Sequence, residues 1–329
     1  MHKTFLRLSQ RTRYALASAA GAVVFAECYY KSNESSRLDK LSRGLRALIE
    51  ENAPSRFDYD ECLLCAKIID AGFEADHVTE ATVAKAASNL DKMGLTNSRF
   101  FYNPRSNAHG FVVTNENVCI VAFRGSREAK DFHQDSKINF ASIDESLDKN
   151  VKAHEGFREC CISIQEDAIR FMKEVNPRKL PLIITGHSLG GANAVLAAYM
   201  ATVYPDKSHD DTHYSIKAMY TYGQPRVGNH HFHEDFKRRG KLDEKLIRVV
   251  NKGDVITRMP PFLSGYRHNG HELFFDEWGI PWWNLHDFYK IRVVIHDFRA
   301  QLIQGKVSFL ENHFMENYLS LLMDNNNKK

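Results

Sequence analysis

The sequence predicts an α/β fold with a mostly parallel central sheet and helices on both faces. Apolar runs of strand length alternate along the chain with segments whose apolar residues recur every three or four positions, as on one face of a helix. Several strand candidates are continuous apolar runs, which is typical of parallel strands buried on both faces. A glycine-rich turn at 186–191 joins one such run directly to a helix candidate.

The predicted helices follow from apolar residues spaced at three and four. Before the glycine-rich turn, Phe157, Cys161, Ile164 and Ala168 share one helical face. Helices are expected at 37–52, 59–71, 78–92, 157–175, 192–200 and 314–323.

The predicted strands are short runs rich in aliphatic residues. The segment 118–123 is apolar throughout, which suits a buried parallel strand. Strands are expected at 118–123, 180–185, 216–222, 246–250 and 292–295.

Length and composition indicate one large domain with extensions. The chain has 329 residues and no Pro-, Ser- or Gly-rich linker divides it. The 43% hydrophobic content is ample for a core, and a net charge of +3 without a basic stripe argues against a nucleic-acid partner. The expected parts are a targeting or anchor segment at 1–26, a helical extension at 27–55, the main domain at 56–320 and a polar tail at 321–329.

Residues 1–26 have the composition of a targeting segment. Lys and Arg residues come first, an apolar run follows at 14–26, and no acidic residue occurs before Glu27. A secretory signal and a mitochondrial presequence both fit this pattern. A retained anchor is a third interpretation, although the thirteen residues of the run are short for a bilayer span. We therefore expect a location in the secretory pathway or at a membrane, with the mitochondrion as the alternative.

The six cysteines and sixteen histidines do not form a specific metal-site pattern. Cys62 and Cys65 form a C-x-x-C pair without a second pair, and most cysteines are expected to be packed free thiols. His230, His231 and His233 are clustered at the expected start of a surface helix. No metal and no cofactor are therefore predicted.

The turn at 186–191 has the G-x-S-x-G pattern of a nucleophile elbow, centred on Ser188. Strand, tight turn and helix around this pattern expose the serine hydroxyl at the top of a sheet. Gly186 and Gly190 allow the strand and helix backbones to approach where a side chain would clash. The amide of Leu189, the residue after the serine, is the first expected oxyanion donor.

A serine nucleophile needs a base, and the base needs an orienting acid. Asp254 follows the predicted strand at 246–250, at the sheet edge where functional residues gather. His313 lies at the start of the last predicted helix and is the preferred base, with His296 as its main rival. The second oxyanion donor is expected at Ser126, just after the strand at 118–123.

Seven segments in order resemble the fungal-type triacylglycerol lipase family, or class 3 lipases. They are 121–126, 131–135, 154–157, 186–191, 222–229, 250–261 with 268–272, and 312–318. The resemblance implies an α/β-hydrolase fold and a lipid-ester hydrolase. It also implies that Ser188 is the nucleophile, Asp254 the acid and His313 the base, with Ser126 and Leu189 forming the oxyanion hole.

The substrate is less closely defined than the chemistry. In the family, a short helix after the oxyanion serine covers the site, but the corresponding residues 127–134 are mostly charged here, with Phe132 as the one large apolar residue. Polar lipids, monoacylglycerols and shorter esters are therefore as plausible as substrates as the lipid of oil droplets. The alternatives are a phospholipase A or galactolipase and a non-catalytic interaction module. The expected partners are a lipid ester and a membrane or lipid surface, with no obligate protein partner.

Overall fold

The computed structural model describes residues 45–73, 78–125, 139–144, 148–203, 214–276, 279–285 and 311–323. The predicted segment at 1–26, most of the extension at 27–55, the predicted strand at 292–295 and most of the tail at 321–329 lie outside the described residues. The division of the chain at these boundaries therefore stays a prediction.

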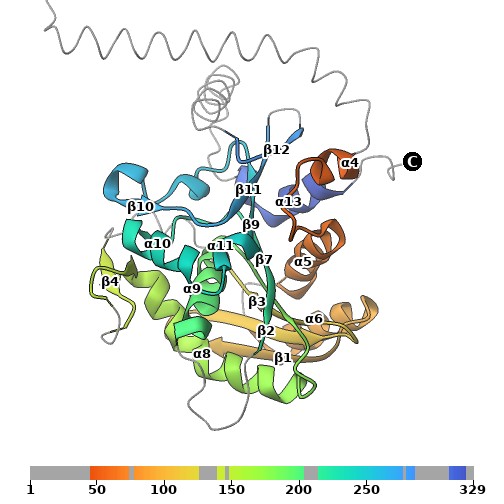
Figure 1. The fold of residues 1–329 in the computed structure, drawn as a ribbon. Coiled ribbons are helices and arrows are strands. Elements are labelled where there is room, and N and C mark those ends of the chain that lie inside the picture. The colour runs from red at the N-terminus through yellow and green to blue at the C-terminus, as the bar shows by residue number, and fades with distance from the viewer. Residues whose placement is uncertain are drawn as a thin grey trace, which may run out of the picture.

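Eight strands form the central sheet in the order β1–β2–β3–β6–β7–β9–β11–β12 (Figure 1). The five strands from β3 to β11 in this order are parallel, whereas β1, β2 and β12 add antiparallel pairs at the edges. The predicted mostly parallel sheet is confirmed. The strands span Thr96–Asn103 (β1), Ala108–Thr114 (β2), Cys119–Phe123 (β3), Leu182–His187 (β6), Ile216–Tyr222 (β7), Leu246–Asn251 (β9), His271–Phe275 (β11) and Pro281–Trp283 (β12).

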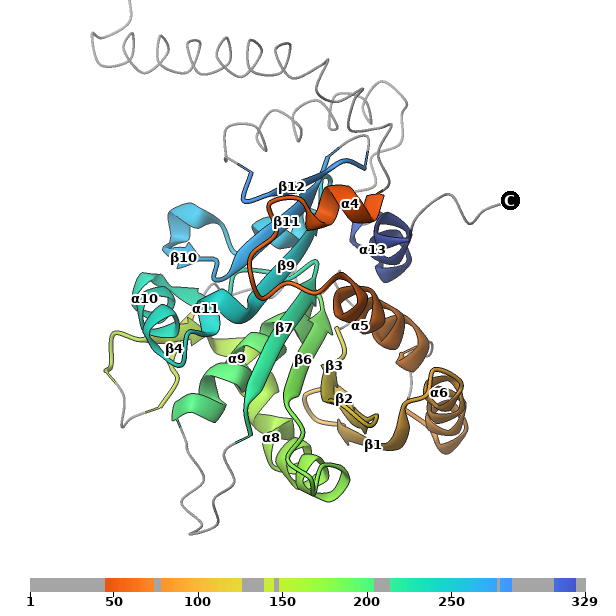
Figure 2. The ribbon, with the colours of Figure 1, turned by 45° about the vertical axis from the view of Figure 1, so that its right-hand side comes forward.

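Helices cover both faces of this sheet, as the two ribbon views show (Figures 1 and 2). Helices α8, α9 and α10 pack on one face, and α4, α5, α6 and α13 pack on the other. Ile184 of β6 lies in the first core and its neighbour Ile183 lies in the second, so this strand needs apolar residues at successive positions. The helices span Leu45–Glu50 (α4), Tyr59–Gly72 (α5), Glu80–Lys92 (α6), Glu155–Val175 (α8), Leu189–Val203 (α9), His230–Arg238 (α10), Leu242–Lys245 (α11) and Met315–Leu322 (α13).

Side-chain caps set the start of helices α5 and α6. Asp58 accepts a hydrogen bond from the amide of Glu61 at the start of α5. Thr79 and Thr82 form a reciprocal capping box at the start of α6. At the other end of the chain, α13 packs against α5, and the Tyr59 hydroxyl donates to the carbonyl of Leu322 at 2.5 Å. The second core thus joins the first and last described parts of the chain.

A small four-stranded sheet, in the order β10–β8–β5–β4, has no counterpart among the predicted strands. Its strands have only two or three residues each, too few for a periodic signal. The strands β1, β2, β11 and β12 are also absent from the predicted set. In β1 the mixed polar and aromatic residues are partly exposed, whereas β2 and most of β11 are buried. The small sheet spans Phe140–Ser142 (β4), Lys152–His154 (β5), Gly228–Asn229 (β8) and Tyr266–Arg267 (β10), and the 3₁₀ turns span Ile256–Arg258 (η1), Phe262–Ser264 (η2) and Glu311–His313 (η3).

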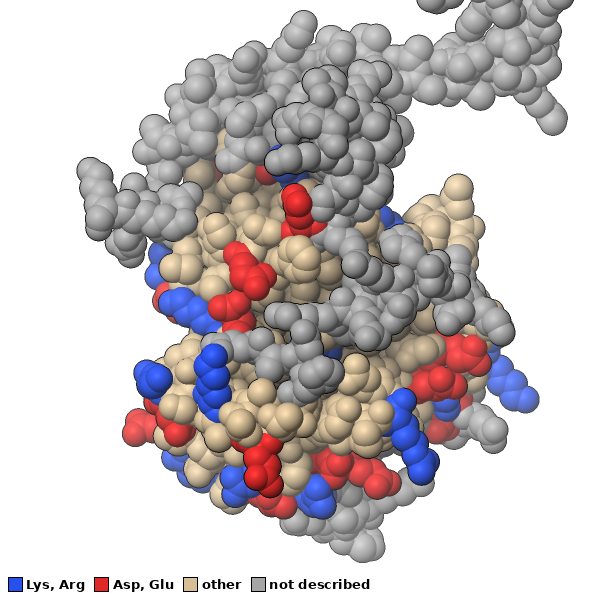
Figure 3. All heavy atoms as spheres, turned by 180° about the vertical axis from the view of Figure 1, so that it is seen from behind, with Lys and Arg blue, Asp and Glu red and all other residues tan. Residues whose placement is uncertain are grey.

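Among the described residues, the face seen in Figure 3 shows no charged patch and no metal-binding cluster is found. On the face seen in Figure 3, acidic and basic side chains are interspersed rather than gathered into one patch. Within the described ranges, no helix is long and apolar enough to cross a bilayer, and no three His, Cys, Asp or Glu side chains are placed to hold a metal ion. The five described cysteines are buried free thiols, and burial raises the pKa of Cys62 to about 12.

Candidate active site

Ser188 lies on a sharp turn between β6 and α9, with a positive φ of 58°. A Cβ on Gly186 would lie 2.2 Å from the carbonyl oxygen of Gly190, and a Cβ on Gly190 would lie 2.1 Å from that of Phe123. Both positions therefore require glycine, as the sequence pattern predicts.

The backbone around Ser188 holds this strained conformation. A non-glycine residue in the left-handed region costs on the order of 1–3 kcal/mol and persists only where its surroundings fix it. The Ser188 amide donates to the carbonyl of Tyr222 at 2.9 Å, and the Ser188 carbonyl accepts from the amide of Gly191 at 2.9 Å. The turn is thus hydrogen-bonded to β7 on one side and to the first turn of α9 on the other.

The structure brings three of the predicted site residues together. The Nε2 atom of His313 lies 2.7 Å from Ser188 Oγ, and its Nδ1 atom lies 2.7 Å from Asp254 Oδ2. Only 6% of Ser188, 5% of His313 and 0% of Asp254 is exposed, so these bonds are screened little by water. Because Asp254 accepts from Nδ1–H, Nε2 is left as the acceptor for the serine hydroxyl.

The Asp254 carboxylate is fully buried and accepts three hydrogen bonds. Besides His313, Ile256 N–H donates to Oδ1 at 2.8 Å and the Tyr318 hydroxyl donates to Oδ2 at 2.5 Å. Burial, followed by the charge of Asp254, raises the pKa of Tyr318 well above its usual value, so the phenol stays a donor. The positive φ of Gly223, 61°, and its missing side chain leave room for Asp254 and His313. Sequence reasoning missed Tyr318, whose signal is a hydroxyl-bearing aromatic on the buried face of the last helix.

His187, the residue before Ser188, contacts His313 through a hydrogen bond and its ring. Its Nε2–H donates to the carbonyl oxygen of His313 at 2.6 Å, and the two rings lie 4.6 Å apart between centroids. Burial, and then the charge that His313 would carry, lower the pKa of His187 to about 3. His187 is therefore neutral at physiological pH and acts as a hydrogen-bond donor. The sequence motif contains it but gives no sign of this role.

Part of this chain is similar to known proteins. Residues 120–264 match the lipase (class 3) family. Over 160 residues the chain is 32% identical to the secreted mono- and diacylglycerol lipase 1 of Fusarium solani, covering 48% of this chain and 44% of that protein. These residues are therefore similar to class 3 lipases. The matched residues contain Ser188 and Asp254, whereas His313 lies beyond them.

A solved lipase structure and a second curated protein are also similar to this chain. The crystal structure of a lipase from Rhizopus microsporus var. chinensis is 25% identical, with a TM-score of 0.52 over 66% of this chain and 74% of that one. The chloroplastic phospholipase A1-Igamma1 of Arabidopsis thaliana is 40% identical over 105 residues, which are 32% of this chain and 19% of that protein. The chain thus spans less than half the length of the two curated relatives.

The predicted oxyanion donors are only partly described. Leu189 is the first residue of α9, so its amide has no acceptor inside the helix. A Cβ on Gly125 would lie 2.6 Å from the His187 carbonyl oxygen, so the loop after β3 contacts the elbow closely. Ser126, the segment at 127–134 and the rival base His296 lie outside the described residues.

His187 should make the stability of this protein depend on pH. Its ordinary pKa of 6.5 falls to about 3 in the folded state, so unfolding binds a proton between these values. The contribution of His187 to the free energy of unfolding is fully present above pH 6.5 and is lost as pH falls toward 3. The expected loss between pH 7 and pH 4 is about 3 kcal/mol. Urea unfolding of the wild type and His187→Gln across this range would measure it.

The matched control for this measurement is His231→Gln, because His231 is exposed in α10. The control should retain the wild-type slope of unfolding free energy against pH, and His187→Gln should flatten it. Identical slopes for all three proteins would mean that His187 is not held neutral in the folded state.

Proposed function

We propose that this chain hydrolyses carboxylic ester bonds of lipids through Ser188, His313 and Asp254. The observation that supports this most directly is the unbroken set of hydrogen bonds from the Asp254 carboxylate through the imidazole to Ser188 Oγ, with both distances 2.7 Å. A serine hydroxyl alone is a weak nucleophile, and this arrangement supplies the base and the group that orients it. The match of residues 120–264 to the class 3 lipase family supports the same chemistry.

In the proposed mechanism, His313 takes the proton of Ser188 as Oγ attacks the ester carbonyl. The amides of Leu189 and Ser126 stabilise the tetrahedral oxyanion, each by about 3 kcal/mol. Asp254 stabilises the imidazolium, which then protonates the leaving alkoxide. Water, activated by His313, releases the acyl group from Ser188. The reaction needs no metal and no organic cofactor.

Two lipid classes are favoured as substrates. The Fusarium relative is named as a mono- and diacylglycerol lipase and the Arabidopsis relative as a phospholipase A1, so we propose partial glycerides first and polar membrane lipids as the alternative. Residues 1–26 would deliver the enzyme to the secretory pathway or a membrane, with the mitochondrion as the alternative. A fluorescent fusion of residues 1–36 would distinguish these locations.

The proposed function is tested by turnover of a graded substrate series. The wild type should hydrolyse p-nitrophenyl esters of increasing chain length, and Ser188→Ala should lose at least about 10⁴-fold in kcat. Ser88→Ala, at an exposed serine on α6, is the control and should keep wild-type rates. Equal turnover by the wild type and Ser188→Ala would refute the proposal. Monoolein, triolein and phosphatidylcholine would then rank the lipid classes.

A further inference from the structure

A turn of exposed apolar residues follows the acid of the triad. The 3₁₀ turn η2 begins at Phe262, a short way after Asp254 in the chain. Leu263 is 97% exposed and Phe262 is 53% exposed. These two residues are adjacent, whereas the other exposed large apolar residues of the described ranges stand apart from one another along the chain. Single exposed apolar residues are ordinary, but neighbouring ones are typical of a contact surface.

This turn has one well-supported conformation. The amide of Gly265 donates to the carbonyl of Phe262 at 3.1 Å, and the positive φ of Gly265, 93°, closes the turn. The next residue, Tyr266, is buried and stacks on Phe140 of β4, with 4.2 Å between the ring centroids. Leu263 is therefore presented to solvent on a fixed support, so a contact made by it costs little conformational entropy.

A cation lies at the base of the turn. The guanidinium carbon of Arg267 lies 3.7 Å from the centroid of the Phe262 ring. Its Nη1 atom donates to the carbonyl oxygens of Phe262 at 3.1 Å and of Tyr266 at 2.8 Å. Among the described residues no acidic side chain pairs with Arg267, and the sequence has no acidic residue at 255–271. The turn thus combines an apolar tip with a positive charge behind it.

The turn lies on the same edge of the sheet as the triad. Ser188 follows β6, and both Asp254 and η2 follow β9, so all three come after the carboxyl ends of parallel strands. The amide of Arg226, after β7, donates to the carbonyl of Met259 at 2.7 Å and holds the loop at this edge. In both ribbon views the chain before β10 lies at the periphery of the molecule (Figures 1 and 2). A surface that η2 touches is therefore on the side of the candidate site.

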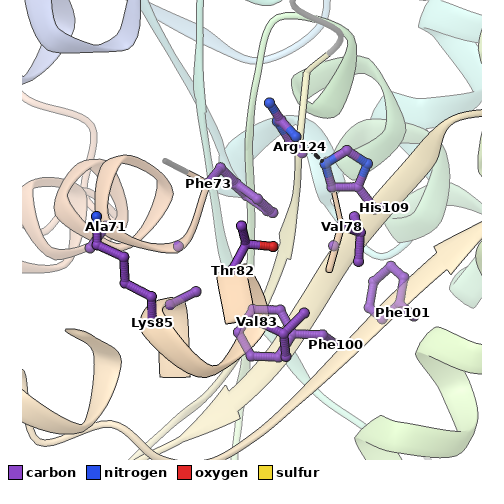
Figure 4. Close-up of a pocket in the computed structure, with 13 residues that line it drawn as sticks. Ala71, Phe73, Val78, Thr82, Val83, Lys85, Phe100, Phe101, His109 and Arg124 are labelled. Carbon is purple, nitrogen blue, oxygen red and sulfur yellow. Dashed lines mark hydrogen bonds between the residues drawn. The ribbon is translucent and has the colours of Figure 1, made fainter. Parts of the chain in front are cut away.

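The cavity shown in Figure 4 is separate from this turn. Its volume is about 190 Å³, and it lies between α5, α6 and the strands β1 and β2. Its apolar walls include Phe73, Val83 and Phe100. Neither the triad residues nor the residues of η2 line it. The apolar surface nearest to Asp254 in the chain is thus on the outside of the molecule, at η2.

We propose that Phe262 and Leu263 insert into the surface of an anionic phospholipid membrane, with Arg267 at the depth of the lipid phosphates. Transfer of apolar side chains from water into the acyl region is favourable, and a guanidinium pairs well with phosphate. Phe and Leu beside a basic residue are the residue types of interfacial membrane anchors. The positive charge favours an anionic surface over a neutral one. The proposal rests on the proposed function, because the lipid substrates of that function are presented at such surfaces.

Insertion is tested on the full chain with a fluorophore at position 263. Leu263→Cys would carry an environment-sensitive fluorophore in a Cys28→Ser and Ser188→Ala background, since the five described cysteines are buried. Vesicles of mixed phosphatidylcholine and phosphatidylserine should raise its emission and shift it to the blue. The same fluorophore at Ser88→Cys, exposed on α6, should not respond. A fluorophore at 263 that stays in water when vesicles are added would overturn the proposal.

A substitution measures the apolar part of the docking. Leu263→Ser should weaken partitioning onto these vesicles at least about tenfold. It should leave the fold intact, because the side chain is 97% exposed. The matched control is Ile169→Ser, at a 40% exposed isoleucine near the end of α8, which leads to the opposite edge of the sheet. Equal partitioning of the two variants would assign membrane binding to another part of the chain and overturn the proposal.

A second substitution measures the contribution of the charge. Arg267→Gln should weaken partitioning about fivefold onto vesicles that contain phosphatidylserine, and less onto pure phosphatidylcholine. Arg267→Lys, which keeps the charge, should recover most of this loss. If Arg267→Gln lost the same affinity for both kinds of vesicle, Arg267 would only support the turn, against the proposal.

A substrate assay separates membrane docking from a role in the site itself. Leu263→Ser in the active enzyme should keep the wild-type rate on soluble p-nitrophenyl butyrate and lose at least about tenfold on monoolein carried in the vesicles. An equal loss on both substrates would mean that Leu263 acts in the substrate pocket, against the proposal. An enzyme inactive on all esters would count against the proposed function, while the vesicle binding of the Ser188→Ala chain would still decide this inference.

Discussion

Replacing Asp254 by asparagine is expected to lower kcat by about 10⁴-fold while the protein still folds. The carboxylate accepts from Ile256 N–H at one oxygen and from His313 and the Tyr318 hydroxyl at the other. An amide must place its NH₂ group against one of these donors. Facing His313, it would favour the tautomer with hydrogen on Nε2, which cannot take the proton of Ser188. Facing Ile256, it would leave that amide without an acceptor.

Asp276→Asn is the matched control for this substitution. Asp276 is also a buried aspartate that follows a strand, and it accepts from the amide of Ile280 at 3.0 Å and the indole of Trp282 at 2.9 Å. It should lose stability without losing the kcat of the folded enzyme. Steady-state kinetics with one soluble ester would compare the two variants. A kcat for Asp254→Asn within about tenfold of wild type would mean that Asp254 does not orient the base.

Replacing Gly190 by alanine is expected to destabilise the fold by about 3 kcal/mol or more. The added Cβ would lie 2.1 Å from the Phe123 carbonyl oxygen and 2.6 Å from the Arg124 carbonyl carbon, and both are backbone atoms. To relieve this steric clash, β3 and α9 would have to move apart, and this movement would disturb the apolar packing on both sides. Denaturant unfolding would measure the loss of free energy.

The control for Gly190 is Gly156→Ala in the first turn of α8. There the nearest side-chain atom to an added Cβ, in the His154 ring, is 3.5 Å away, which is ordinary contact. Alanine also favours a helix by about 0.5–1 kcal/mol over glycine, so this variant should be neutral or slightly stabilised. A Gly190→Ala protein as stable as Gly156→Ala would contradict the close approach of β3 to the elbow.

Strands β3, β6, β7 and β9 and the elbow could be predicted because their signals are local, whereas β2 and β11 were not predicted. Strand β6 is buried on both faces, so its apolar run is continuous, and the elbow requires glycine at fixed positions. Edge strands and the two-residue strands of the small sheet carry no comparable pattern. Their existence depends on partners that are distant in the sequence.

The candidate site was predictable to the same extent. Ser188, Asp254 and His313 follow from a motif, a strand end and a chain order. Tyr318 and His187 do not, because each acts through a contact with a residue that folding brings near. The phenol of Tyr318 meets a carboxylate 64 positions away, and His187 meets a carbonyl 126 positions away. Periodicity within a segment cannot report such contacts.

The candidate site is built from residues of two cores that pack on opposite faces of the sheet. The elbow continues into α9 in one layer, while Tyr318 belongs to the other, where α13 is bonded to α5 through Tyr59 and Leu322. Local unfolding of α5 and α13 alone would remove the hydrogen bond from Tyr318 to Asp254, while Ser188 would stay in place. Catalytic competence is therefore more fragile than the fold, and hydrogen exchange in α13 would report it before global unfolding.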